Sequence, residues 1–173
     1  MATPIEIDVW QGAIAELEVD AIVVSATESL FMNAGAAAGV MRRGGTEIER
    51  AAVAQGPIQP GTAIVTAAGG LAATYVIHAV AVGHDRVADV DRLAAAVRAA
   101  LAFVAPLQLR RLAVAPLGVE HGAFDADEAA RILVATLAEA ATPPLESIVI
   151  ATGNPRETRA VRGAISAHRA GVR

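Results

Sequence analysis

Short apolar runs recur along the sequence and predict the strands of a sheet. Residues 5–9 (IEIDV) alternate apolar and acidic side chains, the period of a strand with one exposed face. Residues 19–24 (VDAIVV) are almost continuously apolar, as expected of a strand covered on both faces. Further strands are predicted at residues 62–66, 75–82, 112–115 and 147–152.

Helices are predicted between these strands. Small residues open a helix that spans residues 33–55, and apolar residues recur at helical spacing over residues 90–104. Asp125 stands three residues before a glutamate, the spacing of a capping box, and Asn154 precedes a proline at the start of the last helix. We therefore expect residues 1–173 to form one α/β domain of three layers, with helices on both faces of a mixed, mostly parallel sheet.

Composition narrows the class of protein. Hydrophobic residues make up 54% of the chain, which is ample for a buried core. The net charge of −4, with no stripe of Lys or Arg, argues against binding to duplex nucleic acid. The lack of cysteine excludes disulfides, zinc–thiolate sites and a cysteine nucleophile. Without a signal-peptide pattern or an apolar run of roughly 20 residues, we expect a cytoplasmic protein that does not enter membranes.

Three segments follow predicted strands at the carboxyl edge of the sheet, where ligands bind in sheets of this kind. They are residues 25–39, 118–124 and 151–154. The first enters its helix through GAAAG, so backbone N–H groups and the helix N-terminus would favour an anion such as a diphosphate. Small residues at such a junction also serve close packing alone. Because the second segment also joins a strand to a helix, the two would form opposite walls of a cleft.

The amino-acid sequences of these segments resemble those of the macrodomain family. Residues 9–27 (VWQGAIAELEVDAIVVSAT) resemble the family's opening, in which Gly-Asp-Ile precedes Val-Asp-Ala-Ile-Val and Asn-Ala-Ala-Asn. Residues 35–41 are similar to its first phosphate loop, residues 61–80 to its middle strands, and residues 112–130 to its second loop and the following helix. The resemblance implies a macrodomain fold with ADP-ribose or a related nucleotide as ligand, and an ADP-ribosylated protein as a further partner.

The base and ribose positions depart from the family pattern. The aspartate that reads the adenine amino group in relatives maps to Ala13, which has no side-chain acceptor. The two asparagines of the opening motif map to Val24 and Thr27, and only the second keeps a polar group. Residues 151–153 contain no aromatic where relatives stack the adenine.

The phosphate loops keep their glycines but change their charge. An acidic residue of hydrolytic relatives maps to Ala38, whereas Glu120 replaces a loop glycine and would repel a diphosphate unless it turns away or binds a cation. Phe124 would line the distal-ribose end, as an aromatic does in relatives. The resemblance assigns ligand binding to Ala13, Ile14, Ser25, Ala26, Thr27, Gly35, Ala36, Ala37, Ala38, Gly39, Val40, Gly118, Val119, Glu120, His121, Gly122, Ala123 and Phe124.

Two candidates for catalysis come from the same loops. Glu120 or His121 would act as a general base facing Thr27 across the cleft, since an imidazole titrates near neutrality. We therefore name Thr27 and His121 as candidate catalytic residues. The alternative is that Glu120 and His121 are solvated loop residues.

The remaining histidines and a basic pair have structural interpretations. His78 lies in a continuous apolar run and is predicted to be a core histidine. His84 and Asp85 would have to join the second loop to hold a metal, and their spacing matches no known ligand motif, so we predict neither a metal nor a cofactor. Arg42 and Arg43 would meet a phosphate or an acidic partner, or form a solvated helix face.

Three functions remain open from the sequence. The first is a binding module for ADP-ribose or a related nucleotide diphosphate. The second is a hydrolase that removes ADP-ribose from a protein or metabolite. The third is a scaffold that retains the fold with a vacated site, in an oligomeric state that the sequence leaves open.

Overall fold

A six-stranded sheet forms the centre of the protein, of which the computed structural model describes residues 4–171. The strand order is β1-β6-β5-β2-β4-β3. Neighbouring strands are parallel except β3, which runs antiparallel to β4. The strands are β1 (Glu6–Gln11), β2 (Ala21–Ser25), β3 (Ala63–Ala67), β4 (Tyr75–Ala79), β5 (Arg111–Val114) and β6 (Ser147–Thr152).

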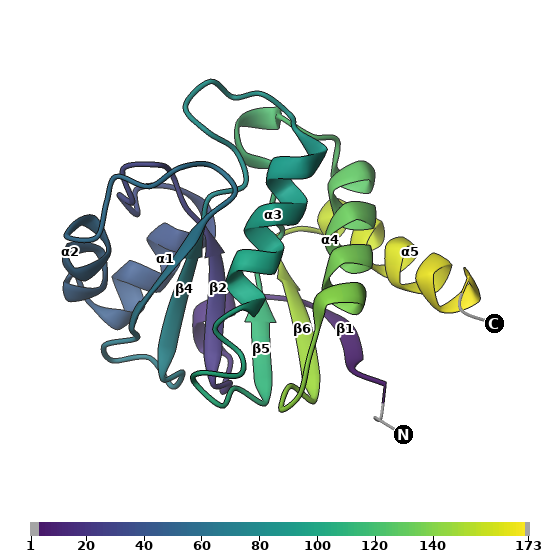
Figure 1. The fold of residues 1–173 in the computed structure, drawn as a ribbon, viewed down its shortest axis with the longest axis horizontal. Coiled ribbons are helices and arrows are strands. Elements are labelled where there is room, and N and C mark those ends of the chain that lie inside the picture. The colour runs from purple at the N-terminus through teal and green to yellow at the C-terminus, as the bar shows by residue number, and fades with distance from the viewer. Residues whose placement is uncertain (1–3, 172–173) are drawn as a thin grey trace.

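Helices cover both faces of this sheet (Figure 1). On one face α3, α4 and α5 share a core with the strands, and on the other face α1 and α2 pack together with a short 3₁₀ turn, η1. The α-helices are α1 (Gly35–Gly44), α2 (Glu47–Val53), α3 (Val90–Leu101), α4 (Ala126–Ala140) and α5 (Pro155–Gly171), and the 3₁₀ turns are η1 (Ile14–Glu16) and η2 (Glu120–Gly122). The predicted three-layer fold with a mixed, mostly parallel sheet is confirmed.

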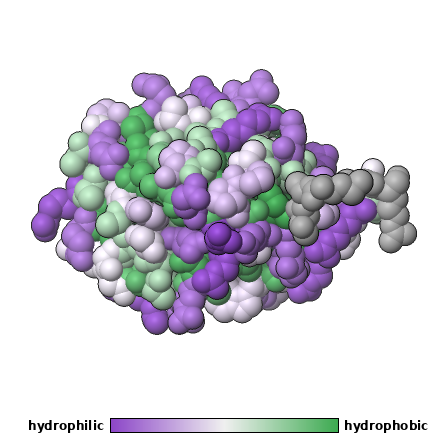
Figure 2. Space-filling view, turned by 60° about the horizontal axis from the view of Figure 1, so that its bottom comes forward, coloured by the Kyte–Doolittle hydropathy of each residue, from purple (hydrophilic) through white to green (hydrophobic). Residues whose placement is uncertain are grey.

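The outer surface is mixed in polarity. Figure 2 shows hydrophobic residues in separate areas between hydrophilic ones on the face it presents. Among residues 4–171, no helix combines the length and the apolar character that crossing a bilayer requires.

The two-sided burial of β2 explains its continuous apolar sequence. Ala21 and Val23 face the core shared with α3, α4 and α5, whereas Ile22 and Val24 face the core under α1. Each of these four residues is at most 1% exposed. Since successive side chains of a strand point to opposite faces, both faces of β2 need apolar residues.

The single helix predicted over residues 33–55 was wrong, because the chain forms two helices there. The break lies at Gly44 and Gly45, and Gly45 adopts φ +112°, a conformation that favours glycine. A Cβ on Gly44 would lie 2.5 Å from the Ile48 side chain and 2.9 Å from that of Leu71. The glycine pair therefore turns the chain at a point where a side chain at Gly44 would not fit.

The strand predicted over residues 75–82 ends earlier, at Ala79. Beyond it the Val80 N–H donates to the carbonyl of Thr62, and the Val80 carbonyl accepts from Gly61. Residues 80–82 nevertheless remain buried, which explains why the apolar run continues past the end of the strand.

Two of the predicted helix starts are confirmed. The Asn154 Oδ1 accepts from the Glu157 N–H at 2.9 Å at the start of α5, and the Asp125 Oδ2 accepts from the Asp127 N–H at 3.2 Å at the start of α4. Both side chains satisfy N–H groups that the first helical turn leaves without a helical partner.

His78 is a core histidine, as predicted. Its side chain is fully buried on β4, and its Nε2 lies 3.0 Å from the Thr66 Oγ1 of β3. Burial lowers the pKa of His78 to about 4, because the charged imidazolium would lose its hydration. The folded protein therefore holds this ring in its neutral form near neutral pH.

This lowered pKa predicts acid destabilisation of the fold. Below pH 6.5 the unfolded chain binds a proton at His78 that the folded chain refuses, so the free energy of unfolding falls as the pH drops from 6.5 towards 4. The loss should be on the order of 3 kcal/mol over that interval. Urea unfolding of the wild type and of His78→Gln should give a smaller pH slope for the variant.

The matched control is His84→Gln, since the His84 side chain is 64% exposed. It should keep the wild-type slope. Equal slopes for the wild type and His78→Gln would show that His78 does not cause the acid sensitivity.

Candidate functional site

A cavity of about 950 Å³ opens at the carboxyl edge of the parallel strands. This volume is at the upper end of the range for small-molecule sites. Its wall is built by the segments that follow β1, β2, β5 and β6, together with one side of α1. The lining residues are 12–16, 25–27, Phe31, 33–37, Gly39, Arg42, Arg43, Val82, Ala115, Pro116, 119–121, Ala151, Gly153, Asn154 and Glu157.

Many of the residues that the sequence assigns to ligand binding line this cavity. Those that line it are Ala13, Ile14, Ser25, Ala26, Thr27, Gly35, Ala36, Ala37, Gly39, Val119, Glu120 and His121. The assigned residues outside the lining are Ala38, Val40, Gly118, Gly122, Ala123 and Phe124. Val40 and Phe124 are buried in the two cores, on opposite faces of the sheet.

The N-terminus of α1 forms one wall of the cavity. Gly35 has φ +57°, which lets the chain turn sharply into the helix. The Ala38 N–H donates to the Ala34 carbonyl at 3.2 Å, so the N–H groups of Gly35, Ala36 and Ala37 precede the hydrogen-bonded ladder of the helix. Together with the helix dipole, these groups suit an anion.

The loop after β5 forms the opposite wall, and some of its N–H groups donate hydrogen bonds to acceptors within the same loop. The Gly118 N–H donates to Glu120 Oε2 at 2.8 Å, and the Gly122 N–H donates to the Val119 carbonyl at 3.1 Å. His121 adopts φ 55° within η2 and is exposed at the cavity. Gly118 and Gly122 therefore shape this loop through their bonds within it.

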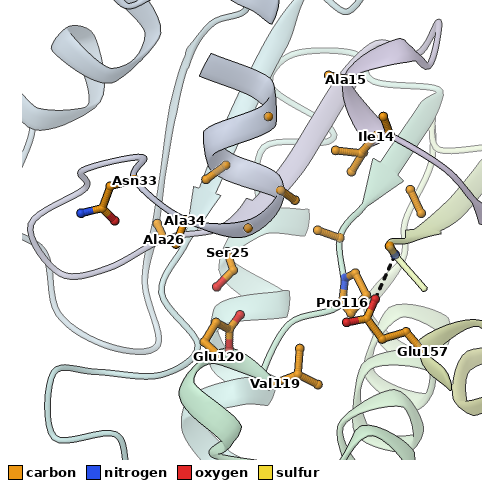
Figure 3. A pocket seen from close by; sticks show the side chains of 18 of the residues that line it. Ile14, Ala15, Ser25, Ala26, Asn33, Ala34, Pro116, Val119, Glu120 and Glu157 are labelled. Atoms are coloured by element: carbon orange, nitrogen blue, oxygen red, sulfur yellow. Dashed lines mark hydrogen bonds between the residues drawn. The ribbon is translucent and has the colours of Figure 1, made fainter. Parts of the chain in front are cut away.

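Glu120 places a carboxylate inside the cavity. Its Oε1 is buried and has no hydrogen-bond partner among residues 4–171. Ser25 and Glu120 point toward each other in Figure 3. Burial raises the pKa of the Glu120 carboxyl, and the Ser25 hydroxyl and the Gly118 N–H offset only part of that rise. The site thus holds a carboxyl group that takes up a proton more readily than an exposed glutamate.

The two ends of the cavity differ in polarity. Ile14, Ala15 and Pro116 lie at one end, and Asn33 lies at the other, beyond Ala34 (Figure 3). Thr27 also lines the cavity, and its Oγ1 lies 3.1 Å from the Ser29 Oγ. One end, called the apolar end, therefore offers aliphatic contacts beside the carboxylates of Glu16 and Glu157, and the other offers hydroxyl and amide groups.

Several lining side chains were not assigned to the site from the sequence. Arg42 and Arg43 line the cavity through α1, and the spacing from Gly35 through Gly39 to these arginines is that of one helix face. Arg43 pairs at 3.8 Å with Glu16, which lines the cavity from η1. The sequence had already raised the arginines as contacts for a phosphate or an acidic partner, whereas only the packing of η1 against α1 reveals Glu16 beside them.

His84 and Asp85 have partners away from the cavity. His84 Nδ1 lies 3.3 Å from Glu28 Oε2, and Asp85 Oδ2 accepts from Arg92 Nη1 at 2.7 Å. Within residues 4–171, no group of three or more His, Cys, Asp or Glu side chains is arranged to hold a metal ion.

Comparison with known proteins finds relatives that match most of this chain. A macro domain-containing protein of Cupriavidus necator is 34% identical over 169 residues, covering 92% of this chain and 97% of the relative. An uncharacterized protein of Mycobacterium tuberculosis is 34% identical over 163 residues, covering 94% of this chain and 45% of the relative. The chain spans about half the length of this mycobacterial relative.

Solved structures share the fold. The Trypanosoma brucei macrodomain in complex with ADP-ribose matches with a TM-score of 0.84 and 21% identity, over 92% of this chain and 69% of that one. The Oceanobacillus iheyensis macrodomain with ADP matches with a TM-score of 0.84 and 18% identity, over 94% and 91% of the two chains. The family model of the Macro domain matches residues 23–133. With this match and these relatives, the chain belongs to the macro domain family.

Proposed function

We propose that the cavity binds ADP-ribose or a closely related nucleotide diphosphate. The observation that carries this proposal is the first turn of α1: Gly35, Ala36 and Ala37 line a cavity of nucleotide size, and their N–H groups precede the hydrogen-bonded ladder of the helix. Such a turn binds a diphosphate through the backbone, so no particular side chain is needed there.

The polarity of the cavity supports one orientation of this ligand. The base would lie at the apolar end, near Ile14 and Ala15, and the distal ribose at the end with Thr27 and Asn33, whose side chains can bond to its hydroxyls. The solved macrodomains of Trypanosoma brucei and Oceanobacillus iheyensis carry ADP-ribose and ADP, which supports a ligand of this class.

Glu120 limits the affinity of this site. When ionised, its carboxylate repels a diphosphate held at the other wall, and the low-dielectric surroundings strengthen that repulsion. Its raised pKa reduces the cost of protonation, and a protonated carboxyl can donate to a phosphate oxygen. We infer that the ligand binds best when Glu120 is protonated.

Hydrolysis of an ADP-ribose linkage is the second candidate function. It is favoured by one observation: Thr27, Glu120 and His121 all line the same cavity. A carboxyl with a raised pKa in a cleft is a common feature of acid–base sites. Thr27 or His121 would then assist a water that the substrate phosphate orients.

The first test is calorimetric titration with ADP-ribose, with AMP and inorganic pyrophosphate as comparison ligands. We expect micromolar binding of ADP-ribose, stronger than that of either comparison ligand. Ala36→Asp should weaken it at least about tenfold, because the new carboxylate would occupy the anion position at the start of α1. An acidic residue in the first turn stabilises a helix, so the fold should persist.

Ala36→Asn is the matched control, since it has nearly the same volume without the charge. It should bind more tightly than Ala36→Asp. An absence of heat and of thermal stabilisation at millimolar ADP-ribose would contradict the proposed function and leave a scaffold role or another ligand.

Glu120 predicts a pH dependence of affinity. Because a bound diphosphate favours the protonated carboxyl, the wild-type affinity for ADP-ribose should rise several-fold as the pH falls from 8 to 5.5. Glu120→Gln should bind more tightly at pH 8 and lose most of this slope. Because His121 also lines the cavity, His121→Gln serves as the comparison, and a slope that persists in Glu120→Gln but vanishes in His121→Gln would contradict the role of Glu120.

The hydrolase candidate predicts that Thr27→Ala or His121→Ala lowers the release of ADP-ribose from an ADP-ribosylated protein. The loss should be about a hundredfold if the residue transfers a proton. Calorimetry on the same variants separates lost binding from lost catalysis. Release at the wild-type rate in both variants would remove these residues from the mechanism.

A further inference from the structure

Glu157 is one of three glutamates that line the cavity, and it lies at the apolar end. The residue lies in the first turn of α5, is half-buried, and lines the cavity beside Pro116 (Figure 3). Its Oε2 accepts from the Gly153 N–H at 2.9 Å, the contact drawn as a dashed line on Glu157 in Figure 3. This bond leaves Oε1 available to accept a hydrogen bond from a ligand.

The turn that carries Glu157 is held in place by several hydrogen bonds. The Glu157 N–H donates to Asn154 Oδ1 at 2.9 Å, and the Thr158 hydroxyl donates to the Asn154 carbonyl at 2.9 Å. The Thr158 hydroxyl also lies 2.6 Å from the buried Thr152 hydroxyl at the end of β6. Because backbone and carboxylate are both anchored, Glu157 presents its acceptor without ordering a flexible side chain on binding.

Other groups at this end are weaker candidates for recognising a base. Ala13 offers no side-chain acceptor. The Glu16 side chain is 56% exposed and pairs with Arg43 at 3.8 Å, so water and a cation compete for its oxygens. Glu157 combines partial burial with an anchored geometry, and a hydrogen bond to a charged acceptor is stronger where water is excluded.

We propose that Glu157 recognises the exocyclic amino group of the ligand's base and thereby makes the cavity selective for adenine over hypoxanthine. This inference rests on the proposed function, because it requires the nucleotide base at the apolar end. A carboxylate accepts from the amino group of adenine, whereas it faces a carbonyl oxygen in hypoxanthine and leaves both acceptors without a donor. Recognition would then come from the start of α5, which follows β6, the strand that pairs with β1 just before Ala13.

The test compares ADP-ribose with its hypoxanthine analogue, inosine diphosphate ribose, by calorimetric titration of the full chain. The wild type should prefer ADP-ribose by about tenfold or more, the effect of one hydrogen bond to a charged group. Glu157→Ala should lose this preference and bind the two ligands to within about threefold of each other. A defect in folding would lower the affinity for both ligands equally and leave the ratio of the two affinities unchanged. A change in that ratio therefore reports recognition of the base.

Glu157→Gln gives a sharper result. If its amide oxygen keeps the bond from the Gly153 N–H, the amide nitrogen faces the base and donates to a carbonyl. We therefore expect Glu157→Gln to prefer inosine diphosphate ribose over ADP-ribose. Glu16→Ala is the matched control, because it removes the other carboxylate at this end and should keep the wild-type preference.

The outcomes separate this inference from the proposed function. If the wild type binds both ligands and the Glu157 variants keep its ratio, Glu157 does not read the base while nucleotide binding stands. The same follows if Glu16→Ala abolishes the preference and Glu157→Ala retains it. If the wild type binds neither ligand, the proposed function fails and this inference fails with it.

Discussion

The position of the cavity depends on the two-sided burial of β2. Its side chains alternate between the core under α1 and the core shared with α3, α4 and α5. A shift of one residue would exchange the two sets and place every side chain against the wrong face. The end of β2 at Ser25 is therefore fixed between β4 and β5, and the chain that leaves it must turn into α1 at the same edge where the loop after β5 returns.

This arrangement places opposing electrostatic features in one cavity. The start of α1 contributes backbone N–H groups and the positive end of a helix dipole, equivalent to about half an elementary charge. Glu120, on the opposite wall, contributes a full negative charge when it is ionised. Burial of its Oε1, which has no hydrogen-bond partner in the described part of the chain, makes that charge costly even in the absence of a ligand. Protonation of Glu120 would remove both the burial cost and the repulsion, so proton uptake would favour the proposed anion binding.

Membership of the macro domain family determines the fold of the chain but not the identity of its ligand. The backbone features that suit a diphosphate follow from the fold, since they need only a strand, a sharp turn at Gly35 and a helix N-terminus. Recognition of a base would depend instead on individual side chains at the rim of that scaffold, and Glu157 is the one proposed for this role. Function in such folds is carried by the site, and this cavity combines the N-terminus of a helix with side chains of its own.

The sequence by itself determined the strands, most of the helices and two of the helix caps, because periodicity and capping are local properties of the chain. It also indicated the two loops that face each other, since carboxyl ends of parallel strands meet at one edge. Local pattern failed at Gly44 and Gly45, where the positive φ of Gly45 ends the helix and Ile48 and Leu71 leave no room for a side chain on Gly44. Only the tertiary structure decided that Glu120 is partly buried against Ser25, that Phe124 belongs to the core and that Glu157 reaches the apolar end. Those outcomes depend on segments far apart in the sequence, and no local pattern records which of them will pack together.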